Sequence, residues 1–238
     1  MRLYYSNKSR SYVAFGNFGD ELNGWIFPKL WPDFFDQPGD DDSVVFVGFG
    51  TLLNTNLPRF KRTVVFGAGV GLGEPPTVDP TWTIYCVRGP RSAAALGLDP
   101  AVGITDPAVW VHRLFPFAEQ QKDIEVSVIP HAWEMLHGEE VFRRSCEELG
   151  YHMIDARWPV ERVMTDIARS RLVLSSAMHG AIAADALRVP WIGFASNSGI
   201  PPFKWQDFCD SMDLPYTHRR VVRLNRITRT CPKLGFIE

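Results

Sequence analysis

Short apolar runs that end in glycine or serine recur along the chain and constrain its fold more than any other feature. Three of them lie in the first half: SVVFVGFG at 43–50, TVVFGAGVGLG at 63–73 and WTIYCVRG at 82–89. Their apolar residues are continuous rather than alternating, which is typical of parallel strands buried on both faces. A helix from about Asp20 and another at 90–98 accompany them. The first half therefore predicts a parallel sheet covered by helices.

The same order of elements restarts in the second half. A strand that runs into a loop is predicted at 124–133, and further strands at 151–157, 171–176 and 190–195. Helices are predicted at 138–150, 159–170, 177–189 and 204–214. The polar, proline-containing stretch RLFPFAEQQKD at 113–123 separates the halves. We therefore expect an α/β protein of two Rossmann-like lobes with a cleft between them, with domains at 1–116 and 117–238. Ligands in such folds lie beyond the carboxyl ends of the strands.

Composition narrows the class of protein. The 238 residues are 45% hydrophobic, enough for a full core, and the formal net charge of −2 gives no overall field for nucleic acid. The four cysteines form no C-x-x-C pair and are interpreted as reduced thiols, and no metal site is expected. The chain shows no membrane span or signal peptide, so a cytoplasmic protein is predicted. The basic tail at 218–229 is interpreted as a solvated face, with a role near an acidic, lipid-linked substrate as the alternative.

The segment Ser175-Ser176-Ala177-Met178-His179-Gly180 lies where a buried strand becomes a helix. Ser175 or Ser176 can cap that helix through its hydroxyl, and the exposed backbone N–H groups of a helix start can bind an anion. His179 falls within the first turn, where it could pass a proton to a bound anion. An ordinary helix start with a packed histidine explains the same pattern.

Two arginines occupy the turn Val87-Arg88-Gly89-Pro90-Arg91-Ser92. A guanidinium binds carboxylate or phosphate through two parallel hydrogen bonds. Arg88 directly follows a buried run, a costly place for a charge that has no partner. This position favours an anion-binding role over an ordinary surface pair.

Other polar groups follow predicted strands or glycine turns. The loop around Gly69 departs from the dinucleotide-binding and Walker patterns, so it is interpreted as a place where backbone approaches a ligand. Asp20, Glu21 and Asn23 follow a glycine turn and could hydrogen-bond sugar hydroxyls, or they could belong to a capped helix start. His131 ends a predicted strand, where a structural or a functional role is open.

Together these segments resemble the polysaccharide pyruvyl transferase family, in particular its bacterial exopolysaccharide branch. The resemblance rests on NFGDELN at 17–23, GFGT at 48–51, FGAGVG at 66–71, VRGPRS at 87–92, TDPA at 105–108, IPH at 129–131, SSAMHGAIAADALRVPWI at 175–192 and KWQDF at 204–208. The family is similar in fold to GT-B glycosyltransferases. The resemblance implies an acceptor side in the first lobe and a donor side in the second.

The resemblance also implies a reaction, in which a pyruvyl group passes from phosphoenolpyruvate to a sugar as a ketal. Phosphoenolpyruvate is then a co-substrate, and no further cofactor or metal is expected. The acceptor is a sugar or oligosaccharide of an exopolysaccharide or of its lipid-linked precursor. Association with the inner face of the membrane and homo-oligomer formation are left open.

The residues matching the family motifs receive roles as hypotheses. His179 would be the general acid or base, and Arg88 and Arg91 would hold phosphate or carboxylate. Ser175 and Ser176 would complete the anion site, and His131 could assist from the second lobe. Asp20, as a catalytic residue, with Glu21 and Asn23, would orient the acceptor or deprotonate its hydroxyl, and the loop at Gly69 would approach the ligand. Two other functions stay open: a GT-B glycosyltransferase that uses a nucleotide sugar, and a non-catalytic ligand-binding protein of exopolysaccharide assembly.

Overall fold

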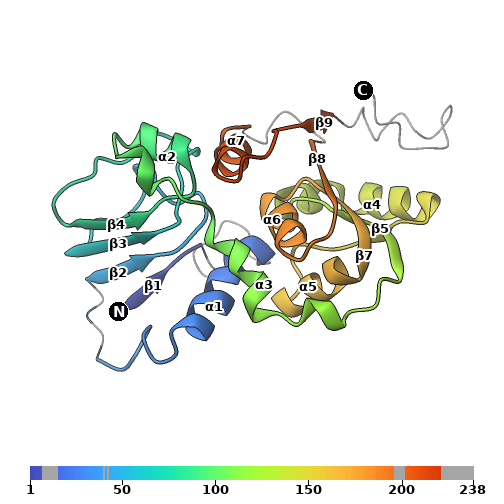
Figure 1. The fold of residues 1–238 in the computed structure, drawn as a ribbon, viewed down its shortest axis with the longest axis horizontal. Coiled ribbons are helices and arrows are strands. Elements are labelled where there is room, and N and C mark those ends of the chain that lie inside the picture. The colour runs from blue at the N-terminus through green and yellow to red at the C-terminus, as the bar shows by residue number, and fades with distance from the viewer. Residues whose placement is uncertain (7–15, 40, 42, 196–201, 221–238) are drawn as a thin grey trace. The chain divides into compact units, whose positions relative to one another are not determined.

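A computed structural model describes residues 1–6, 16–39, 41, 43–195 and 202–220 (Figure 1). These residues form two compact α/β units, each built on a parallel sheet, which confirms the predicted α/β class with two Rossmann-like lobes. The first unit holds 1–6, the described part of 20–108, and 202–216, and the second holds 16–19, 109–195 and 217–220. Most of the predicted basic tail, 221–229, lies outside the described residues, as does Cys231.

The sheet of the first unit has the strand order β1-β2-β3-β4, and each neighbouring pair is parallel. Its strands are β1 (Arg2–Tyr4), β2 (Val44–Val47), β3 (Arg62–Phe66) and β4 (Trp82–Cys86). The helices are α1 (Phe18–Leu30), α2 (Pro90–Ala95) and α7 (Pro202–Ser211), and the 3-10 turns are η1 (Pro100–Val102) and η2 (Pro107–Trp110), whose last two residues belong to the second unit. Helix α1 begins in the second unit at Phe18 and Gly19.

Aromatic side chains attach α1 to the first sheet. Phe27 packs edge-on against Phe46 of β2 with ring centroids 5.0 Å apart, and Trp31 packs against Phe66 of β3 at 5.7 Å. Trp31 directly follows the last residue of α1, and its N–H donates to the Phe27 carbonyl at 2.9 Å, so the two side chains lie on the same side of the chain. Edge-to-face aromatic pairs add to the hydrophobic gain from burial. The connections after β2 (48–61) and after β3 (67–81) contain no helix, so loops form this end of the sheet.

The sheet of the second unit has the order β6-β5-β7-β8-β9, again with parallel neighbours. Its strands are β5 (Ile124–Ile129), β6 (His152–Met153), β7 (Ser170–Ser175), β8 (Trp191–Ala195) and β9 (His218–Arg220). The helices are α3 (Val111–Leu114), α4 (Ala132–Leu149), α5 (Val160–Arg169) and α6 (Met178–Ala186), with the 3-10 turn η3 (Phe117–Glu119).

Helices cover both faces of the second sheet. Met135 and Phe142 of α4 belong to one buried cluster with Val128 of β5 and Leu174 of β7. Ile129 points to the opposite face from Val128 because side chains alternate along a strand. A Cβ on Gly180 would come within 3.2 Å of the Ile129 side chain, so α6 approaches the sheet closely on that face. Helix α5 contacts α6, β5 and β7.

The compact units are not contiguous in sequence, whereas the expected domains were 1–116 and 117–238. The chain passes from the first unit to the second after Ala108 and returns to the first for α7, which contacts α2. The predicted helix at 204–214 thus belongs to the unit built mainly from the first half. Within the described ranges, no helix has both the length and the hydropathy needed to cross a membrane.

Candidate active site

In each unit, the predicted site residues gather where the parallel strands end. In the second unit, β7 ends at Ser175 and α6 begins at Met178, so Ser176 and Ala177 form the turn between them. Ser176 N donates to the carbonyl of Ile129, the last residue of β5, at 3.1 Å. This bond holds the turn beside the end of the neighbouring strand.

The serine hydroxyls do not cap α6, and this expectation was wrong. The N-cap residue is Ala177, which makes no side-chain hydrogen bond to the helix start. The Ser175 hydroxyl instead donates to the Ala177 carbonyl at 2.8 Å. A helix start without a side-chain cap leaves its amide donors to other acceptors, the arrangement that suits anion binding.

The Ser176 hydroxyl joins two turns of the second unit. It donates to the carboxylate of Glu134 and accepts a hydrogen bond of 2.9 Å from the backbone N–H of His131. Glu134 Oε2 also accepts from the same N–H at 2.9 Å. Glu134 is buried, and its hydrogen bonds satisfy a group that would otherwise be costly to bury. The turn after β5 and the turn after β7 are therefore fixed to each other.

His131 caps the start of α4. Its Nδ1 accepts a hydrogen bond of 3.2 Å from the backbone N–H of Trp133, and Glu134 completes a capping box. The ring thus has a structural partner at Nδ1. A role for His131 toward a substrate stays a prediction.

His179 lies in the first turn of α6 as predicted and packs against the beginning of α1. A Cβ built on Gly19 would lie 2.1 Å from His179 Nδ1, so the ring rests on the glycine backbone. Phe18 N donates to the Ala156 carbonyl at 2.6 Å, which fixes this end of α1 within the second unit. Within the second unit, the segments 17–19 and 175–180 thus meet at His179.

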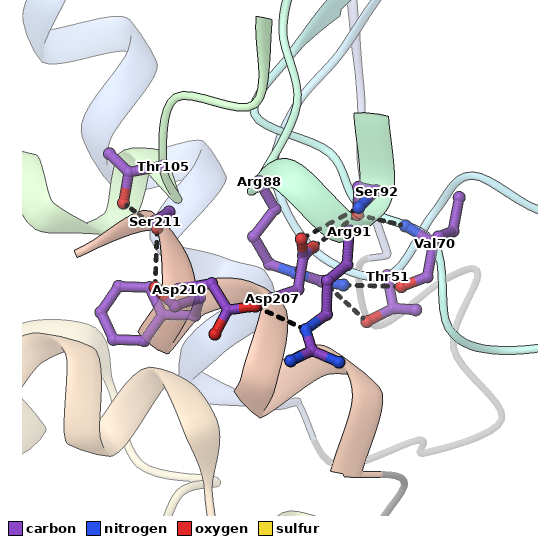
Figure 2. A network of polar contacts seen from close by, with 10 residues as sticks. Thr51, Val70, Arg88, Arg91, Ser92, Thr105, Asp207, Asp210 and Ser211 are labelled. Atoms are coloured by element: carbon purple, nitrogen blue, oxygen red, sulfur yellow. Dashed lines mark hydrogen bonds and ion pairs between the residues drawn. The ribbon is translucent and has the colours of Figure 1, made fainter. Parts of the chain in front are cut away.

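In the first unit, Arg88 is the centre of a buried polar network (Figure 2). Its Nε donates to Asp207 of α7 at 3.0 Å, and both side chains are 0% exposed. Its Nη1 donates to Thr51 Oγ1 at 3.1 Å, and its Nη2 donates to the Val70 carbonyl at 2.6 Å. Asp207 also accepts from the backbone N–H and the hydroxyl of Ser92, at 2.9 and 2.5 Å.

Burial and charge act in opposite directions on Arg88. Burial lowers the pKa of the guanidinium from its ordinary value, while the charges of Asp207 and Asp106 raise it. Arginine keeps its proton in proteins, so the two side chains form a true ion pair. The guanidinium has internal partners on three nitrogens, and its role toward a substrate anion stays a prediction.

Gly69 makes room for Arg88. A Cβ at this position would lie 2.4 Å from Arg88 Cζ. The guanidinium bonds to Thr51 after β2 and to Val70 after β3, so it holds the two glycine-rich loops together. The group that closely approaches Gly69 is therefore the Arg88 side chain, and approach by a ligand stays a prediction.

Arg91 is the exposed counterpart of Arg88. Its Nε donates to Asp210 at 2.6 Å, and its Nη1 donates to Gln206 at 3.2 Å. The Arg91 side chain is 43% exposed. Arg91 thus also bonds to side chains of α7, but its own side chain is exposed to solvent.

The acidic residues predicted at the start of α1 lie in its first turn, and both are half-buried. Asn23 is buried, and its amide donates to the Asp20 carbonyl and the Phe49 carbonyl at 3.1 Å each. It therefore joins α1 to the loop after β2. Roles of Asp20, Glu21 and Asn23 toward an acceptor stay predictions.

Two buried carboxylates of these networks were not predicted as site residues. Asp207 lies in KWQDF, a segment that carried the family resemblance without a role. Glu134 follows His131 by three residues, the spacing of a capping box, which is a signal present in the sequence. Within the described residues, no three His, Cys, Asp or Glu side chains are grouped to hold a metal ion.

Comparison with known proteins identifies relatives. The model of the family described as polysaccharide pyruvyl transferase matches residues 2–198. The succinoglycan biosynthesis protein ExoV of Rhizobium meliloti (strain 1021) is 39% identical over 209 residues. That match covers 87% of this chain and 65% of ExoV, so the chain spans just under two thirds of that relative's length.

Proposed function

The chain belongs to the polysaccharide pyruvyl transferase family, and on that basis we propose that it transfers a pyruvyl group from phosphoenolpyruvate to a sugar. The acceptor is a sugar of an exopolysaccharide or of its lipid-linked precursor. The name of ExoV, a succinoglycan biosynthesis protein, supports an exopolysaccharide acceptor. The observation that supports the proposal most is His179, placed beside the uncapped start of α6 at the end of a parallel sheet.

The reaction requires one protonation and two attacks by oxygen. A proton adds to the methylene carbon of phosphoenolpyruvate, and positive charge develops at the carbon that carries the phosphate. A sugar hydroxyl attacks that carbon and loses its proton, and the bond to phosphate breaks. A second hydroxyl attacks the same carbon, loses its proton and closes the cyclic ketal. The products are the ketal and inorganic phosphate, so atoms and charge balance.

His179 is proposed as the proton donor because imidazole titrates near neutral pH. A positioned general acid contributes about 10²- to 10⁴-fold to a rate. The amides at the start of α6 are proposed to bind an anionic group of the donor, helped by the helix dipole. Arg91 is proposed to bind an anionic group, and Arg88 to act mainly by holding the loops that it joins. Asp20 is proposed to accept the proton of an acceptor hydroxyl.

Phosphate release tests this proposal. The protein is incubated with phosphoenolpyruvate and a panel of galactose- and glucose-terminated oligosaccharides, and the products are examined by mass spectrometry. We expect phosphate release that depends on the acceptor, together with an oligosaccharide that carries a ketal-linked pyruvyl group. Thermal stabilisation by UDP- or GDP-sugars, with no release of phosphate from phosphoenolpyruvate, would instead support a glycosyltransferase.

A further inference from the structure

Gly19 lies where a side chain would collide with His179. A Cβ at Gly19 would be 2.1 Å from Nδ1, 2.6 Å from Cγ and 2.9 Å from Cβ of the histidine. All three distances are shorter than real Cβ contacts, and they involve the Cβ atom of His179 as well as atoms of its ring. An alanine at position 19 would therefore force the whole His179 side chain to move.

Backbone conformation does not explain this glycine. Gly19 is in α1 and is absent from the glycines with positive φ. Alanine is more favourable than glycine inside a helix by up to about 1 kcal/mol. The structure therefore explains glycine at position 19 by the space that it leaves for the His179 side chain.

The two backbones that enclose the ring are both anchored. At the start of α1, Phe18 is buried and donates to the Ala156 carbonyl, and Gly19 N donates to Asn17 Oδ1 at 3.2 Å. At the start of α6, a Cβ on Gly180 would lie 2.7 Å from Ser175 Oγ, so this helix is close against β7. Neither helix start can shift without breaking packing or hydrogen bonds of the second unit.

We propose that Gly19 is a positioning residue for His179. Its backbone forms a rigid surface that fixes the orientation of the imidazole, and only glycine leaves room for the ring. The proposal rests on the proposed function, in which His179 donates the proton. In this proposal, the glycine turn at 16–19 positions His179 of the second unit. The sequence had predicted acceptor binding for the whole polar segment that begins with this turn.

Steady-state phosphate release by Gly19→Ala, His179→Ala and the double variant tests this proposal. We expect Gly19→Ala to lower kcat by at least about 10²-fold, within the range for loss of a general acid, with a much smaller change in KM for phosphoenolpyruvate. In the His179→Ala background, Gly19→Ala should have no further effect on kcat, because the residue that it positions is gone. Independent, multiplicative losses would overturn the proposal.

Gly138→Ala is the matched control in the same unit. A Cβ at Gly138 would meet only Phe142, at 3.8 Å, which is an ordinary contact. Gly138 lies at a kink of α4, and its φ of −142° is outside the left-handed region that favours glycine. Because the added Cβ makes only an ordinary contact, we expect this variant to keep kcat within about twofold of wild type. An equal loss of kcat in Gly138→Ala and Gly19→Ala would overturn the proposal.

NMR gives a second measurement that does not depend on turnover or on folding of a variant. Wild-type protein should show a nuclear Overhauser effect between the Gly19 α protons and the His179 ring protons, and its absence would overturn the proposal. Full activity of His179→Ala would refute the acid in the proposed function. Loss of activity in His179→Ala with normal kcat in Gly19→Ala would refute the positioning role alone.

Discussion

Arg88 and Asp207 form an ion pair between residues 119 positions apart, with Nε and Oδ2 separated by 3.0 Å and both side chains fully buried. One turn further along α7, Asp210 pairs with Arg91, and there both side chains are partly exposed. The turn after β4 and the start of α2 are thus attached to α7 by one buried and one exposed pair. Both pairs join an arginine to an aspartate, so the contributions of a buried and an exposed ion pair to stability can be compared within one protein.

Asp207→Asn should destabilise the protein far more than Asp210→Asn. Loss of one partner of a buried pair leaves an uncompensated charge and costs about 3–5 kcal/mol, whereas an exposed pair contributes about 0–1 kcal/mol. Urea unfolding of the two variants measures the difference in the free energy of unfolding. Equal effects of the two substitutions would contradict the buried ion pair.

Gly69→Ala should displace the Arg88 guanidinium, because its Cβ would lie 2.4 Å from Cζ. Overpacking of this kind costs about 1–3 kcal/mol, and here it would also weaken the bonds to Thr51 and Val70. The free energy of unfolding is the measurement, with Gly138→Ala as the control. A Gly69→Ala protein as stable as wild type would show that the loop has room to spare.

Ser176→Ala should cost about 1–3 kcal/mol, because it removes a hydrogen-bond partner from the buried Glu134 and from His131 N–H. Ser43 provides the control, since its hydroxyl donates to Asp41 at 2.6 Å on the exposed surface. We expect Ser43→Ala to change the free energy of unfolding by less than about 0.5 kcal/mol. If Ser176→Ala were equally mild, the turns after β5 and β7 would not depend on this hydroxyl.

Two buried thiols predict a loss of stability at alkaline pH. Burial raises the pKa of Cys86 and of Cys146 to about 11 from an ordinary value of 9.0. Between these values the unfolded chain loses thiol protons that the folded chain keeps, so the free energy of unfolding falls as pH rises. Urea midpoints at about pH 8 and pH 10.5 should diverge more for wild type than for a Cys86→Ala, Cys146→Ala variant. The same divergence in both proteins would contradict this assignment.

Much of the fold follows from local patterns in the sequence. Continuous apolar runs predict the cores of β2, β3, β5 and β7, because strands of a parallel sheet are buried on both faces. The membership of α7 in the first unit does not follow, because it depends on Asp207 meeting an arginine 119 residues away. No local pattern in the chain encodes that partner.

The candidate site shows the same limit. The glycines at 19 and 69 were interpreted as part of a polar helix start and as a loop that approaches a ligand, and the structure fills the space beside them with His179 and Arg88. Glycine patterns predict a close approach, but they do not say which group approaches. The turn after β7 could be predicted from sequence, whereas the partners of its serines could not.

The proton-donating role of His179 is the central claim, and acceptor-dependent phosphate release by His179→Ala tests it most directly. With phosphoenolpyruvate and acceptor at saturation, and with far-UV circular dichroism and unfolding midpoint matching wild type, kcat should fall by about 10²- to 10⁴-fold. A correctly folded His179→Ala protein that releases phosphate at the wild-type rate would contradict it.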